Sequence, residues 1–118
     1  MAAGMGRLDE IVVDCADPAR LARFWAALLG GCPVDRAPDW SYVDPPGSQP
    51  RLAFQRVPES KQSPKNRLHL DIDVPDIAAV RAALVGHGAQ VVGEVQTDDQ
   101  GAFQVMLDPE GNEFCLVR

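Results

Sequence analysis

The feature that most constrains the fold of this chain is an internal repeat. Residues 10–17, Glu-Ile-Val-Val-Asp-Cys-Ala-Asp, align with residues 69–76, His-Leu-Asp-Ile-Asp-Val-Pro-Asp, and aspartate stands at the fifth and eighth places of both. Residues 42–47, Tyr-Val-Asp-Pro-Pro-Gly, align in the same way with residues 106–111, Met-Leu-Asp-Pro-Glu-Gly. A unit that occurs twice in 118 residues predicts the same order of elements in each half.

Each half is predicted to contain a strand, a helix and three further strands. Asp17 is expected to cap the first helix, with Pro18 at its first position and glycines at its end. Asp76 is expected to cap the second helix, which glycines also end. Further strands are expected at about residues 33–37, 40–44, 51–57, 90–96, 102–107 and 113–117.

The predicted fold is α+β, built from two βαβββ repeats within a single domain that spans residues 1–118. The first repeat covers about residues 8–57 and the second about residues 67–117. The segment of about residues 58–66 between them is interpreted as a solvated linker, whose charges are not expected to form a binding patch.

Charge and cysteine content exclude several classes of function. The net charge of −6 argues against binding to nucleic acid or to an anionic membrane surface, because both need clustered basic residues. No stretch of the sequence reaches the ~18 apolar residues of a membrane span. Three cysteines without a Cys-x-x-Cys spacing predict neither a disulfide framework nor a zinc knuckle, so a cytoplasmic protein is expected.

The repeated unit resembles that of the glyoxalase/bleomycin resistance protein/dioxygenase (vicinal-oxygen-chelate) superfamily. The motifs that carry the resemblance are IVVDCADPARLARFWAALLG, HLDIDVPDIAAVRAALVGHGA and DPEGNEF, and together they span most of the chain. The resemblance implies curved mixed sheets around one cavity, and a homodimer in which halves can assemble across two chains. It does not by itself assign a function.

The resemblance also implies four positions at which metalloenzymes of this superfamily carry His or Glu ligands. Here these positions hold Glu10, Gln55, His69 and Cys115, with Glu113 on the same strand face as Cys115. Divalent ions favour several His or carboxylate ligands, so we expect no metal at this set. The alternative is a divalent metal, whose candidate ligands are Glu10, His69, Cys115 and Glu113.

Other residues are expected to line the cavity or to act in it. Trp40 and Tyr42 are candidates for an aromatic wall, and Asp71 has the same strand parity as His69. Phe103 is expected in the core instead. Cys115 and His69 could share the cavity, although the sequence reveals no third residue that would orient them as a nucleophilic pair.

Three hypotheses for function follow. The first is a small-molecule-binding protein without a full metal site. The second is a divalent-metal-dependent lyase, isomerase or dioxygenase of the superfamily. The third is a metal-free enzyme in which His69 transfers protons and Glu10 orients it or acts as a base. A His69→Ala substitution separates the three hypotheses. Ligand binding should survive largely intact in the first case, and metal content should fall in the second. In the third case, turnover without metal should fall.

Overall fold

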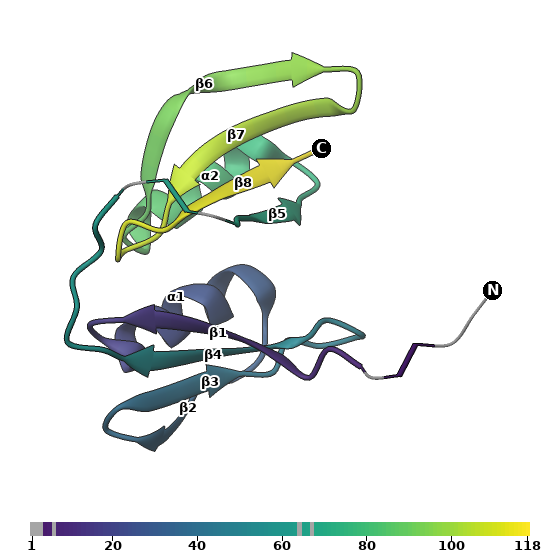
Figure 1. Ribbon diagram of the computed structural model, residues 1–118. Coiled ribbons are helices and arrows are strands. Elements are labelled where there is room, and N and C mark those ends of the chain that lie inside the picture. The colour runs from purple at the N-terminus through teal and green to yellow at the C-terminus, as the bar shows by residue number, and fades with distance from the viewer. Residues whose placement is uncertain (1–3, 6, 64, 67) are drawn as a thin grey trace. The chain divides into compact units, whose positions relative to one another are not determined.

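The computed structural model of the chain describes residues 4–5, 7–63, 65–66 and 68–118. These residues form two compact units, one ending at Pro58 and the other starting at Glu59 (Figure 1). The first unit contains β1 Glu10–Cys15, α1 Pro18–Leu29, β2 Val34–Ala37, β3 Trp40–Val43 and β4 Arg51–Arg56. The second contains β5 Leu70–Asp73, α2 Ile77–Gly86, β6 Gln90–Asp98, β7 Gly101–Leu107 and β8 Glu113–Val117.

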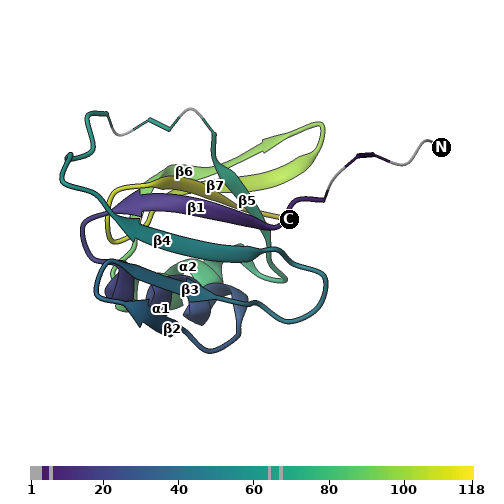
Figure 2. The same cartoon turned by 60° about the horizontal axis from the view of Figure 1, so that its bottom comes forward.

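The two units repeat one topology, which confirms the predicted βαβββ pattern. The strand order is β1-β4-β3-β2 in one sheet and β5-β8-β7-β6 in the other. In each sheet the first strand pairs in parallel with the last, and the other neighbours are antiparallel. Figure 2 shows the strands of the first sheet in this order, with α1 behind them.

Helix α1 begins and ends where the sequence predicts. The Asp17 carboxylate accepts a hydrogen bond from the backbone N–H of Arg20, and Pro18 occupies the first turn. At the other end, Gly30 has a positive φ of 91° and donates its N–H to the Ala26 carbonyl. The buried face of the helix consists of Pro18, Leu21, Ala22, Phe24 and Trp25.

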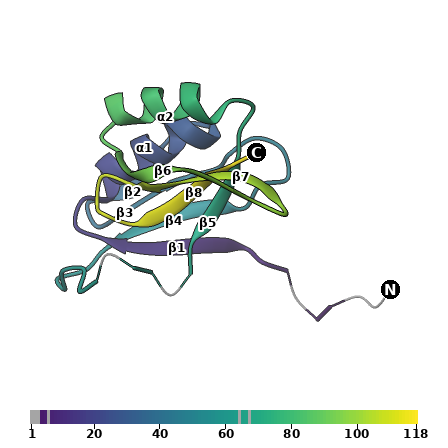
Figure 3. The same cartoon turned by 90° about the horizontal axis from the view of Figure 1, so that it is seen from above.

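Helix α2 repeats this arrangement in the second unit. The Asp76 carboxylate accepts a hydrogen bond from the N–H of Ala79, and Ile77 and Leu84 are buried. Figure 3 shows α2 across one face of its sheet. Neither helix of the described residues has the length and apolar character needed to cross a membrane.

Strand alternation divides each sheet into a face that packs against its helix and a face that points away, which we call the open face. In the second sheet, Phe114, Leu116 and Met106 are buried on the helix side. Gln104 lies on the same side, where its Oε1 accepts a hydrogen bond from Arg81 of α2. Residues one position away on these strands therefore belong to the open face.

Candidate ligand-binding site

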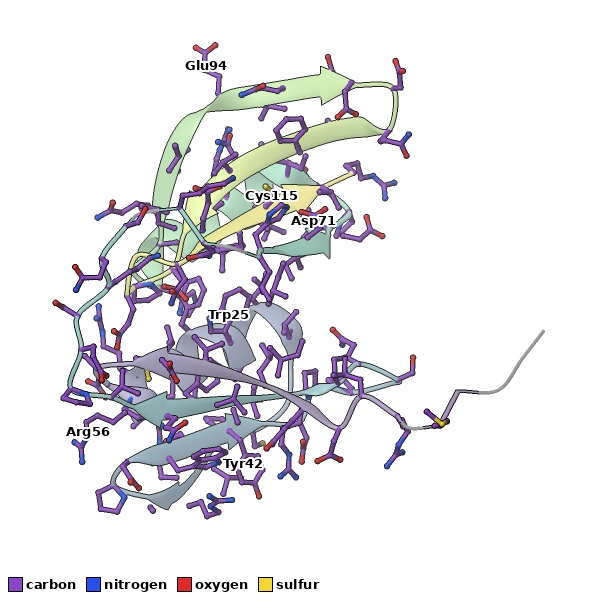
Figure 4. All side chains as sticks on the ribbon, viewed as in Figure 1. Trp25, Tyr42, Arg56, Asp71, Glu94 and Cys115 are labelled. Carbon is purple, nitrogen blue, oxygen red and sulfur yellow. The ribbon has the colours of Figure 1, made fainter. Side chains whose placement is uncertain are left out.

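The second sheet brings several of the predicted site residues onto its open face. In the parallel pairing of β5 with β8, Asp71 is the partner of Cys115, and in the antiparallel pairing of β7 with β8, Val105 is the partner of Cys115. Paired residues point to the same side of a sheet. Asp71, Cys115 and Val105 therefore stand side by side on the face away from α2, and Figure 4 shows Asp71 and Cys115 as neighbours.

A cavity of about 540 Å³ lies over this face. The apolar part of its lining includes Phe103, Val105 and Val117. Its polar part includes His69, Asp71, Cys115, Glu113, Lys65 and Arg118. A concave surface that combines an apolar wall with a few converging polar groups is typical of small-molecule sites.

His69, Asp71 and Cys115 form a compact group within this cavity. The Nε2 atom of His69 lies 3.3 Å from Oδ1 of Asp71, and one donor atom from each of the three residues lies within 4.8 Å of the others. The side chains of His69 and Asp71 are 44% and 57% exposed, whereas Cys115 is buried. Asp71, which the sequence predicted only as a lining residue of the cavity, is thus the third residue beside Cys115 and His69.

The charges around Cys115 determine its chemistry. Burial raises the pKa of the Cys115 thiol, and the carboxylates of Asp71 and Glu113 raise it further, while the Lys65 ammonium partly offsets them. A thiol in this environment stays protonated at neutral pH. This argues against Cys115 as a free nucleophile, even with Asp71 in place to orient His69.

Lys65, in the segment that was interpreted as a solvated linker, contributes to the lining of the cavity although its side chain is 70% exposed. The Lys65 ammonium lies 3.1 Å from the Glu113 carboxylate, and the Asn66 side chain donates a hydrogen bond to the Glu113 carbonyl. These contacts bind the segment to the start of β8. Lys65 lines the cavity as a result, although 48 residues separate it from Glu113.

Phe103 was expected in the core, but the structure places it half-buried in the lining of the cavity. Phe103 pairs with Val117 across β7 and β8, and both line the cavity on the open face. The physical reason is parity, because Phe103 is two residues from Val105 and so points to the same side of the strand. The pairing of β7 with β8 places Phe103 next to Val117, and this pairing could not be predicted from the sequence alone.

The other predicted site residues lie together in the first unit. The open face of the first sheet holds Glu10, Gln55, Trp40 and Tyr42. Trp40 pairs with Gln55, and Tyr42 pairs with Ala53, so all of these side chains point to one side. Glu10, at the start of β1, pairs with Arg51 and points to the same side. The indole Nε1 of Trp40 is buried and has no hydrogen-bond partner among the described residues.

Arginines cover both aromatic rings of this face. The guanidinium of Arg36 lies 4.5 Å from the centre of the Trp40 ring, and that of Arg51 lies 3.9 Å from the Tyr42 ring. Arg51 also donates two hydrogen bonds to Asp44, of 2.7 and 3.0 Å, and this contact lowers the pKa of the Asp44 carboxyl. The two rings are thus held by cations of their own unit.

The model of the glyoxalase-like domain family matches residues 10–117. This chain belongs to the glyoxalase-like domain family. Over 115 residues, the glyoxalase-like chain is 23% identical to the Bacillus subtilis (strain 168) protein whose name is "Uncharacterized protein YetH", and the match covers 93% of this chain and 96% of the relative.

Solved structures share the fold of this glyoxalase-like domain. A glyoxalase/bleomycin resistance protein/dioxygenase family enzyme from Burkholderia phytofirmans PsJN matches with a TM-score of 0.78 and 16% identity, over 94% of this chain and 97% of the other. A glyoxalase-related enzyme from Fulvimarina pelagi matches with a TM-score of 0.73 and 19% identity, over 96% and 88%. At these identities the likeness demonstrates the fold and leaves the ligand to be argued from the site.

The donor atoms of the glyoxalase-like domain fit a divalent metal of borderline softness. His69, Asp71 and Cys115 offer an imidazole nitrogen, a carboxylate oxygen and a sulfur, which are the three ligand types that zinc accepts. Two of the four metal candidates predicted from the sequence, His69 and Cys115, belong to this group. Glu113 instead forms an ion pair with Lys65. Glu10 lies in the first unit. Asp71 joins the group although it was predicted only as part of the cavity wall.

Proposed function

We propose that this glyoxalase-like domain binds a small organic molecule in the cavity of the second sheet. The observation that carries the proposal is the cavity itself, whose volume of about 540 Å³ falls within the range of known small-molecule sites. The ligand would place an apolar part, aromatic or aliphatic, against Phe103 and Val117. Its polar groups would meet His69, Asp71 and Glu113.

The first unit is proposed to contribute to ligand binding as well. Trp40, Tyr42 and Gln55 share one face of its sheet, and the unpartnered Trp40 Nε1 is a hydrogen-bond donor that a ligand oxygen would satisfy. Glu10 on the same face is proposed to act as a base toward a ligand that binds there. The support for these roles is their common face and the repeat register.

His69 is the proposed proton carrier of the site. Its Nε2 lies 3.3 Å from a carboxylate oxygen of Asp71, and its side chain is open to the cavity. An imidazole that is oriented by a carboxylate can accept a proton from a bound ligand and return it. If the ligand is a substrate, this is the step that a metal-free member of the family would use.

A divalent-metal-dependent lyase, isomerase or dioxygenase is the second candidate function. The observation that favours it is the group of His69, Asp71 and Cys115. A divalent ion held by these residues would act as a Lewis acid on a substrate oxygen. Residual activity of metal-stripped protein would exclude this candidate, and activity that requires added metal and is lost in His69→Ala would support it.

The binding proposal is tested by screening small aromatic acids, amines and amides for an increase in melting temperature. A Val105→Trp variant fills the cavity, so it is expected to lose the increase. A Val85→Trp variant adds the same ring on an exposed position of α2 and is expected to keep it. Equal responses of both variants would place the ligand elsewhere and overturn the proposal.

We also propose that the protein is a homodimer and acts in the cytoplasm. The family resemblance supports the dimer. The three free cysteines and the absence of a disulfide among the described residues agree with a reducing compartment. Size measurement and fractionation of the source cells, respectively, test these two statements.

A further inference from the structure

We propose that the first unit carries a separate ligand site, which binds a small zwitterion of the amino-acid class at the loop between β3 and β4. A cavity of about 660 Å³ lies there, lined by residues 7–9 of the segment before β1 and by residues 44 and 47–51. Figure 1 shows this loop beside that segment. All of the lining residues belong to the first unit, so the inference is independent of the ligand proposed for the second unit.

The two repeats use the Asp-Pro-x-Gly motif for different purposes. In the second repeat, the buried Asp108 side chain accepts hydrogen bonds from the backbone N–H groups of Glu110 and Asn112, so its carboxylate holds the turn together. In the first repeat, the Asp44 side chain is 58% exposed and binds Arg51 instead. The carboxylate of the first motif is therefore available to orient a cation at the cavity.

The loop between β3 and β4 is also longer than its counterpart in the second repeat. It spans residues 44–50, whereas the counterpart spans residues 108–112. The longer loop brings Ser48 and Gln49 to the cavity wall. Gln49 donates a hydrogen bond from Nε2 to the Pro46 carbonyl, which fixes its amide and leaves Oε1 as an acceptor for a ligand.

Arg51 is held in one orientation by two contacts. Its Nε and Nη2 atoms donate hydrogen bonds of 2.7 and 3.0 Å to Asp44, and its guanidinium lies 3.9 Å from the centre of the Tyr42 ring. Asp44 occupies one edge of the guanidinium, so the Nη1 atom is left to donate to an anionic oxygen of a ligand. A guanidinium that is already fixed loses little conformational freedom on binding, which favours the recognition of a carboxylate.

The charges of the lining select the ligand, because they occur in opposite pairs. Arg7 and Arg51 are positive, and both line the cavity. Asp9 and Asp44 are negative and line it as well. Arg51 and Asp44 neutralise each other in their ion pair, which leaves Arg7 and Asp9 to face the ligand.

A ligand with a single charge would meet one of these two residues as an unfavourable neighbour, since Asp9 opposes an anion and Arg7 opposes a cation. A zwitterion avoids both conflicts. Its carboxylate would face Arg7 and Nη1 of Arg51, and its ammonium would face Asp9. The Gln49 Oε1 atom is a further acceptor for the ammonium, and Leu8 offers an apolar contact for the rest of the molecule.

The site is tested by following backbone amide shifts by NMR while the protein is titrated with leucine, isocaproate or isoamylamine. The three compounds share one branched carbon skeleton, but isocaproate lacks the ammonium and isoamylamine lacks the carboxylate. We expect leucine to shift amides within residues 44–51. We also expect it to bind about tenfold more tightly than either singly charged compound, because each of those loses one charge-assisted contact.

Two substitutions separate the roles of the charges. Arg7→Gln is expected to lower the affinity for leucine to that for isoamylamine, and Asp9→Asn to lower it to that for isocaproate. Arg20→Gln and Asp39→Asn make the same changes at exposed positions outside the cavity, so both are expected to keep the affinity of the parent.

Three results would overturn the proposal. One is a leucine titration that shifts no amide within residues 44–51. Another is equal affinity for leucine and for either singly charged compound, which would mean that the two charges are not recognised together. The third is a loss of affinity in Arg20→Gln or Asp39→Asn as large as in the cavity variants. Failure of the ligand screen on the second unit would affect none of these measurements.

Discussion

Cys115 lies in an environment in which burial and two carboxylates both raise the pKa of its thiol. In metal-free protein, its alkylation by iodoacetamide is therefore expected to rise only at a pH above the usual range of a cysteine. Asp71→Asn removes one of the negative charges, so it lowers the pKa of Cys115 and moves the alkylation profile to lower pH. Peptide mass spectrometry in a Cys32→Ser background measures the rate at this site.

Asp73→Asn serves as the control for this change. Asp73 is also exposed and also on β5, but it is not among the charges that raise the pKa of Cys115. Its removal is expected to leave the profile in place. Equal shifts in both variants would show that net charge, and not the contact between Asp71 and Cys115, governs the thiol.

At the scale of single residues, the sequence predicted part of the site. The repeat aligned His69 with Glu10, and parity placed Asp71 beside His69, but no spacing in the sequence gives the 3.3 Å contact between them. Lys65 was not predicted because its contact with Glu113 depends on the path of an irregular segment. Such paths are set by tertiary contacts and not by a local pattern.

Gln104 determines the shape of β6, although it belongs to the neighbouring strand. The register of β6 with β7 shifts between Val92 and Gln96, and Gly93 in this bulge has a positive φ of 69°. The fully buried Gln104 side chain donates hydrogen bonds to the carbonyls of Val92 and Gly93, where the bulge begins.

We expect Gln104→Leu to lower the free energy of unfolding by about 1–3 kcal/mol, because the hydrogen bonds of the fully buried Gln104 amide to Val92, Gly93 and Arg81 are lost. Gln96→Leu makes the same change at an exposed position of β6 and is expected to stay within about 0.5 kcal/mol of the parent. Urea denaturation monitored by circular dichroism gives both values. Similar losses in the two variants would contradict the role assigned to Gln104.

The cap of α2 gives a second prediction for an element. Asp76→Ala removes the acceptor for the Ala79 N–H and is expected to cost about 1 kcal/mol of stability. Asp76→Asn retains an acceptor oxygen, so it is expected to recover most of this loss. Thermal unfolding of the three proteins measures the difference, and an Asn variant as unstable as the Ala variant would indicate that the carboxylate charge matters more than the hydrogen bond.

Elements were more predictable than contacts. Caps and glycines fixed both helices because those signals are local, as the Asp17 and Asp76 hydrogen bonds confirm. Strand β6 was expected to end near residue 96 and continues to Asp98, since pairing with β7 extends past the pattern. Gly93 was the one residue in the sequence that could have indicated the bulge. No sequence pattern indicated that Gln104 would bind its carbonyl groups.

At the scale of the whole molecule, the repeat predicts the topology of both units while the functional groups differ between them. The second unit holds a nitrogen, an oxygen and a sulfur donor in one group, and the corresponding face of the first unit holds Glu10, Gln55 and two arginine-covered rings. The fold is thus duplicated and the chemistry is not.

The proposed homodimer makes a prediction about salt. Each chain carries a net charge of −6, so two chains repel each other, and ions screen this repulsion over a distance of about 10 Å at 0.1 M salt. Light scattering is therefore expected to report a mass near twice 12.8 kDa, with dissociation on dilution that becomes weaker as the salt concentration rises. A mass of one chain at every concentration and salt level would exclude the dimer. A dimer that dissociates as salt rises would indicate that ion pairs between chains, and not apolar contacts, hold it together.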